Sequence, residues 1–151
     1  MHRDSIIYGV LAGLIANFIK LVVAWIGQLM GWLDYMFVHF ALGLFMPQEF
    51  VNNPLALFLG YVTDFANGAL LGVLLVYIFR LAGKDYGIIK GAIYGILIHV
   101  ILYGGIIQFN VTNIYEISPL PNFVILVSNT IFGIVAAWFI ERYYNIEQKV
   151  S

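Results

Sequence analysis

The residues of this chain best suited to chemistry are a lysine, an aspartate and a histidine that each interrupt a long apolar run. Lys20, Asp64 and His99 stand far from the ends of these runs. An unpaired Lys or Asp at the centre of a membrane helix costs about 2.5–3.5 kcal/mol, so such residues pair with each other or line a wet cavity. A histidine adds a group that titrates near neutral pH. Together they could bind a small solute or relay protons, or they could join helices as buried polar contacts.

Recognisable catalytic and metal-binding patterns are missing from the sequence. The chain has no cysteine, and its three histidines, His2, His39 and His99, stand far apart. That spacing matches neither HxxxH nor HExxH. Its glycines recur inside apolar runs rather than in a phosphate-binding loop. We therefore expect no metal, no cofactor and no catalytic residues.

The composition places the chain in a membrane. Of its 151 residues, 62% are hydrophobic and only 10% are charged, whereas a soluble domain is about 45–50% apolar and about 25% charged. These values exclude a soluble globule, and they exclude a disordered chain because disordered chains are poor in apolar residues. The net charge of −1 provides no basic surface for nucleic acid. We expect membrane lipids around the chain and no nucleic-acid partner.

Four apolar segments are long enough to cross a bilayer, which takes about 20 residues. They cover residues 6–30, 55–81, 86–109 and 122–143. The expected fold class is all-α, an integral membrane four-helix bundle that forms one polytopic domain over residues 1–151. A further apolar stretch, residues 33–46, is too short to span. We expect it to be either an interfacial helix over one end of the bundle or a re-entrant segment, and we favour the interfacial helix.

The distribution of cations sets the expected orientation. With four spans, six of the seven Lys and Arg residues fall on one side of the membrane: Arg3, Arg80, Lys84, Lys90, Arg142 and Lys149. Cytoplasmic loops carry the excess of Lys and Arg. We therefore expect a multi-pass protein of the cell (cytoplasmic) membrane with both termini in the cytoplasm.

Small residues recur at helical spacing in every span. Membrane helices associate by close packing and interhelical hydrogen bonds, and small residues permit that packing. The glycines expected to mediate it, several of them in GxxxG motifs, are Gly9, Gly13, Gly60, Gly68, Gly72, Gly87, Gly91, Gly95 and Gly133. The polar residues of each span lie on the same stripes, so we expect these faces to point inward.

The polar residues of the spans are expected at similar depths in the outer half of the membrane, because they lie at similar distances in sequence from the outer ends of their spans. Lys20 lies about nine residues from the outer end of its span, which is roughly 14 Å at 1.5 Å per residue. Asp64 lies at a matching depth on the next span, so we predict a Lys20–Asp64 ion pair. One turn deeper, Asn17 is expected opposite Asn67. The full expected cluster comprises Lys20, Asp64, His99, Asn129, Asn17 and Asn67.

Three stretches follow the pattern of a known family. Residues Gly9–Trp25 read GVLAGLIANFIKLVVAW, Lys84–Val100 read KDYGIIKGAIYGILIHV, and residues 132–144 read FGIVAAWFIERYY. The first stretch resembles the opening helix of the YagU-like small multi-pass proteins of the bacterial inner membrane, with a late lysine. The second resembles a later helix of that family, in which a glycine repeat leads to a histidine. The resemblance implies a bacterial inner-membrane protein, and it transfers no activity and no site.

Two functions compete on this reading. The first is transport or permeation of a small solute or protons through the polar cluster. The alternative is a non-catalytic structural or accessory subunit, in a larger membrane complex or in a homo-oligomer; the small size and the aromatic segment 35–45 favour it. A membrane enzyme acting on a lipid or quinone, with His99 or Asp64 as base, ranks lowest because no second catalytic group is evident. We therefore do not expect an enzyme.

Overall fold

The computed structural model describes residues 2–114 and 118–144 of the chain, with the backbone alone for residues 2–4, 106 and 107. Every regular element of this described part is helical. Three helices are long and apolar enough to cross a membrane. They are α1 (His2–Leu29), α3 (Pro54–Ala82) and α6 (Pro119–Tyr143). The first, second and fourth predicted spans are thus confirmed as helices, with ends that differ by a few residues.

The helix starts follow from local chemistry. Asn53 precedes α3, and its side-chain oxygen accepts hydrogen bonds from the backbone N–H groups of Leu55 and Ala56. Pro54 and Pro119 each occupy the first position of a helix. Proline is favoured there because the N–H that it lacks would have no partner within the helix.

The third predicted span, residues 86–109, is helical but interrupted. It consists of α4 (Gly87–Ile98), the π-helix η2 (His99–Tyr103) and α5 (Gly104–Gln108). The structure thus has three long apolar helices and a shorter apolar one. The π-helical turn begins at His99, and π-helical turns are frequent at functional sites.

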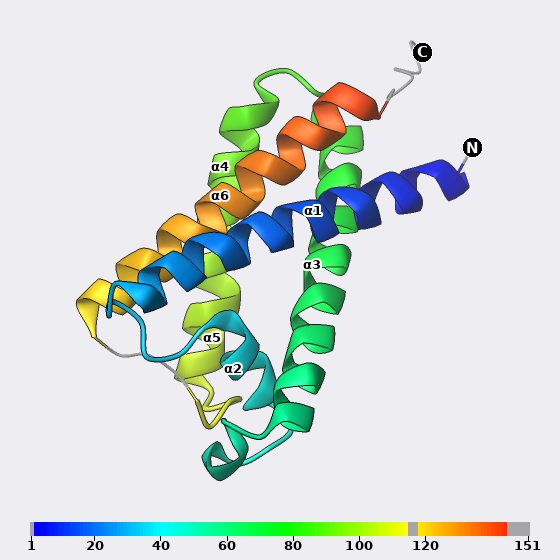
Figure 1. Cartoon of the computed structure of the whole chain (residues 1–151). Coiled ribbons are helices and arrows are strands. Elements are labelled where there is room, and N and C mark those ends of the chain that lie inside the picture. The colour runs from blue at the N-terminus through cyan, green and yellow to red at the C-terminus, as the bar shows by residue number, and fades with distance from the viewer. Residues whose placement is uncertain (1, 115–117, 145–151) are drawn as a thin grey trace.

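The four long helical segments do not form a closed ring. α1 packs against both α3 and α6, and α4 packs against the other side of α6. α3 and α4 are consecutive but have little contact with each other, and they diverge away from the turn that joins them (Figure 1). The hydroxyl of Tyr94 on α4 bridges the two helices by donating to the carbonyl of Leu71 on α3 at 2.7 Å.

Glycines lie where the helices approach most closely. A Cβ atom on Gly68 would lie 2.8 Å from the Cβ atom of Asn17, where α3 crosses α1. A Cβ atom on Gly133 would lie 2.7 Å from the backbone nitrogen of Gly95, where α6 crosses α4. Such distances leave no room for a side chain. Close neighbours also surround the other glycines assigned to packing from the sequence: Gly9, Gly13, Gly60, Gly72, Gly87 and Gly91.

The short helix α2 (Phe37–Leu42) fills the space that α3 and α4 leave at the end away from their turn. All six of its residues are buried, and it lies between α3 and α5 (Figure 1). Gly60 of α3 permits this position, since a Cβ atom there would lie 2.6 Å from the carbonyl oxygen of Val38. Protein thus covers α2 on its described neighbours' side, which the sequence did not predict.

Candidate functional site

The predicted ion pair is present between α1 and α3. Lys20 Nζ lies 2.9 Å from Asp64 Oδ1, and each side chain is only 8% exposed. The two residues face each other because α1 and α3 run antiparallel and cross at their glycines. Removing a charge from water costs several kcal/mol even after relaxation, so the two charges depend on each other for compensation.

Asn17 completes a three-residue site with this pair. It lies three residues before Lys20 on α1, and its Nδ2 donates to Asp64 Oδ2 at 2.7 Å. Each carboxylate oxygen of Asp64 therefore has its own donor. The other polar atom of the Asn17 side chain, Oδ1, is buried and has no hydrogen-bond partner among the described residues. One acceptor at the centre of the site is thus left open.

An aromatic ring from α2 covers the lysine. Lys20 Nζ lies 4.1 Å from the centroid of the Phe37 ring. A cation over an aromatic face gains about 0.5–2 kcal/mol, with the larger values in desolvated sites. The ring therefore both stabilises the ammonium group and separates it from the space beyond α2.

His99 does not contact the Lys20–Asp64 pair directly; a series of aromatic ring contacts lies between them. Phe37 is followed by Phe40 at a centroid distance of 6.2 Å, and Phe40 by Tyr103 at 5.4 Å. His99 stacks on Tyr103 at 5.3 Å with an angle of 17° between the rings. Its Nδ1 is buried without a hydrogen-bond partner among the described residues. His99 is therefore separated from the charged pair by the rings of Tyr103, Phe40 and Phe37.

Two asparagines of the expected cluster lie elsewhere. Asn67 is exposed rather than opposite Asn17. The reason is rotation about the helix, because α1 meets α3 along residues spaced by four, such as Asp64 and Gly68, and Asn67 lies about 100° away from Gly68. Asn129 is buried on α6 where that helix crosses Gly95, which places it one turn from His99 along α4.

A second polar cluster lies at the other end of the molecule, beside the α3–α4 turn. The Ser5 hydroxyl lies 2.8 Å from the Tyr144 hydroxyl, which also accepts a hydrogen bond from Arg80 Nε at 3.1 Å. Lys84 Nζ donates to the Tyr144 carbonyl at 2.6 Å. The sequence predicted that Arg80 and Lys84 lie on one side of the membrane, but it did not connect them with Ser5 or Tyr144. The sequence could have indicated this contact, because the start of α1 and the end of α6 lie at the same depth in the membrane as Arg80.

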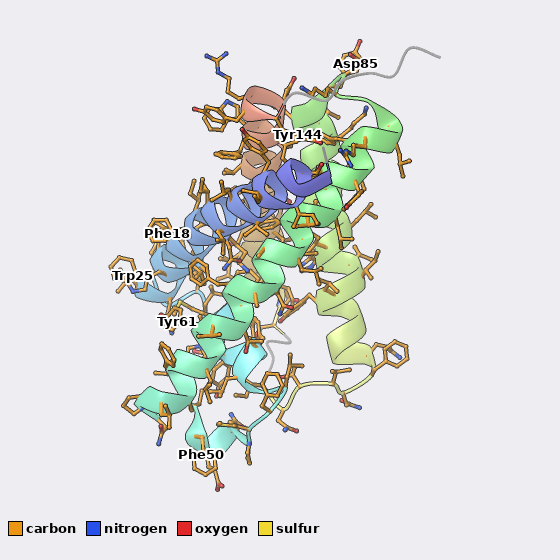
Figure 2. All side chains as sticks on the ribbon, turned by 90° about the vertical axis from the view of Figure 1, so that its right-hand side faces the viewer. Phe18, Trp25, Phe50, Tyr61, Asp85 and Tyr144 are labelled. Carbon is orange, nitrogen blue, oxygen red and sulfur yellow. The ribbon has the colours of Figure 1, made fainter. Side chains whose placement is uncertain are left out.

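A shallow depression of about 550 Å³ lies at this same end, lined by Lys84, Asp85, Tyr86 and Glu141. Figure 2 shows Asp85 and Tyr144 at one end of the molecule and Phe50 at the other. The depression is thus remote from the segment that carries α2. Among the described residues, no group of three or more His, Cys, Asp or Glu side chains could hold a metal ion.

The chain matches no family model, no curated protein and no solved structure in the three comparisons made with known proteins.

Proposed function

We propose that the chain crosses the membrane four times, with both termini on the cytoplasmic side of the cell membrane. The third crossing is the stretch Gly87–Gln108, in which α4, η2 and α5 follow one another without a break. At about 1.5 Å per residue this stretch is about as long as the 30 Å hydrocarbon core. Large apolar side chains such as Phe18, Trp25 and Tyr61 are exposed on α1 and α3, as a lipid-facing surface requires (Figure 2).

Within this topology we propose a permeation site for protons or a small polar solute, formed by Lys20, Asp64 and Asn17. The observation that carries the proposal is a buried ion pair inside two apolar helices, with an open acceptor on Asn17 beside it. Ionisable residues within membrane spans are rare, and they mark substrate and ion pathways in many membrane proteins. α2, which lies toward the outer side in this orientation, closes the site through Phe37.

The alternative is a structural subunit in which the pair only connects α1 to α3. It is favoured by the complete pairing of Asp64, whose two oxygens both accept hydrogen bonds. Replacing a buried ion pair by apolar residues of similar size is often neutral for stability or even stabilising. The two functions therefore differ in flux: only the permeation site predicts that the natural chain conducts and that a folded variant without both charges does not.

The test is flux through reconstituted liposomes. Proton entry is followed with an enclosed pH-sensitive dye under an imposed gradient, and the entry of small polar solutes is followed by light scattering. We expect flux for the natural chain, loss of flux for Asp64→Asn, and loss of flux for the folded double variant Lys20→Met/Asp64→Leu. Ser128→Ala is the matched control, since Ser128 is buried and, among the described residues, bonds only the Val124 carbonyl of its own helix.

Two outcomes would reject permeation. One is a natural chain whose flux does not exceed that of protein-free liposomes. The other is a folded double variant that conducts as well as the natural chain. Either result would leave the structural role as the function of the ion pair.

A further inference from the structure

Asn67 is a polar side chain directed outward from a membrane-spanning helix. It is exposed and lies close to the midpoint of α3. The structure gives its amide no hydrogen-bond partner among the described residues. An amide left without partners in hydrocarbon costs several kcal/mol. A group outside the described part of the chain is therefore needed to meet the Asn67 amide at the centre of the membrane.

The surface around Asn67 is shaped to receive another helix. Thr63 and Ala66 are small, and the Thr63 hydroxyl is already bonded to the Leu59 carbonyl at 2.9 Å. Larger side chains are exposed beyond them, with Leu70 at 58% and Leu74 at 46%. A shallow strip of small residues bordered by larger ones lets two helix backbones approach closely in a membrane.

We propose that this surface binds α3 of a second copy of the chain. The asparagine amide is self-complementary because it both donates and accepts hydrogen bonds. Two copies inserted in the same orientation are related by a two-fold axis along the membrane normal, which brings each residue opposite its equivalent at the same depth. Asn67 then donates to Asn67 of the partner subunit and accepts from it in return.

This dimer does not depend on the proposed permeation site. Asn67 and Gly68 are neighbours in sequence, but Gly68 faces Asn17 of the same chain whereas Asn67 points outward. The contact would therefore form whether the Lys20–Asp64 pair conducts or only joins helices.

The absence of cysteine from the chain permits a clean cross-linking test. Thr63→Cys and Leu74→Cys each place one thiol on the proposed contact face while keeping Asn67. Tyr61→Cys is the matched control, because Tyr61 is 42% exposed on α3 but lies on another side of the helix. In membranes under mild oxidation, we expect disulfide-linked dimers from the first two variants and few from the third.

The decisive variant is Asn67→Leu, which should fold normally because the side chain is exposed. We expect it to abolish the cross-link at residues 63 and 74. In liposomes, where dimer formation is measured by energy transfer between labelled copies, we expect it to raise the dimer dissociation constant by about fivefold to thirtyfold. Asn67→Gln, which keeps the amide, should retain part of the association. A natural chain that is monomeric at all protein-to-lipid ratios, or an Asn67→Leu chain that associates as before, would overturn the proposal.

Discussion

Asn17 donates its hydrogen bond to the one Asp64 oxygen that Lys20 does not occupy, at 2.7 Å. The two donors lie three residues apart on α1 and hold the carboxylate from two sides. Asn17 thus supplies a hydrogen-bond donor to the carboxylate oxygen that the ion pair with Lys20 leaves without one. Such a site is stable only while every member is present, because an unpaired polar group is costly in a medium of low dielectric constant.

Removal of the Asn17 amide should therefore destabilise the protein measurably. We expect Asn17→Ala to lower the free energy of unfolding by about 1.5–3 kcal/mol, the usual worth of a hydrogen bond to a charged group. Thr130→Ala is the control, because within the described part of the chain the Thr130 hydroxyl bonds only the Leu126 carbonyl of its own helix, α6. Unfolding of the detergent-solubilised protein by increasing fractions of SDS provides the measurement. Equal losses in the two variants would contradict a special role for Asn17.

The ion pair should behave as a unit. Lys20→Met leaves Asp64 charged, buried and bonded only to Asn17, so we expect a loss of about 3–5 kcal/mol of stability, as for other broken buried pairs. The double variant Lys20→Met/Asp64→Leu removes both charges but leaves the buried Asn17 amide without its acceptor, so we expect it to lose about 1–3 kcal/mol, less than Lys20→Met alone. The same SDS titration measures both variants. A double variant that loses more stability than Lys20→Met alone would contradict the prediction and would mean that Asp64 stabilises the fold independently of Lys20.

The depth of the polar residues in the membrane could be predicted from the sequence, whereas the helix face on which each side chain lies could be predicted only for some of them. Lys20 and Asp64 could be matched from the sequence because the rise of a helix per residue is fixed and isolated charges in a membrane are costly. Asn67 could not be placed in the same way. Its face depends on how α3 rotates against α1, and that rotation is set by contacts such as Gly68 against Asn17. One residue of difference along the helix separates the buried face from the exposed one.

The position of α2 and the π-helical turn were missed for different reasons. The segment FVHFAL has apolar residues on every side, which is a signal for burial rather than for an interfacial helix with one polar face. The burial of α2 could therefore have been predicted from the sequence. The contact between Gly60 and Val38 could not. The change of helix type at His99 has no local sequence signal that we can identify.

The helix crossing at Gly68 should tolerate no added methyl group. A Cβ atom there would lie 2.8 Å from the Asn17 Cβ atom, whereas a Cβ atom on Gly104 meets nothing within 4 Å. We expect Gly68→Ala to cost about 1–3 kcal/mol through forced shifts of α1 and α3. Gly104→Ala, the matched control, should be neutral or stabilising by up to about 1 kcal/mol, since alanine favours a helix more than glycine does. Comparable losses in both variants would show that the glycines act through backbone flexibility instead.

Acid should weaken the enclosure of the site by α2. His39 Nδ1 accepts a hydrogen bond from the Met36 backbone N–H at 3.0 Å at the start of α2, and burial lowers the pKa of His39 below its ordinary value of 6.5. Because the folded state then binds the proton less readily than the unfolded state, the neutral histidine contributes full stability above about pH 6.5. That contribution is lost as the pH falls through the lowered value. Protonation also turns Nδ1 into a donor, which can no longer accept from Met36.

We therefore expect the natural chain to lose stability between pH 7.5 and pH 5, and to lose less of it in the variant His39→Asn. The asparagine oxygen can still accept from the Met36 N–H but does not titrate in this range. The SDS titration at both pH values isolates the contribution of His39, because His2 and His99 are present in both proteins. An identical pH dependence in the two chains would show that His39 does not control the stability of α2.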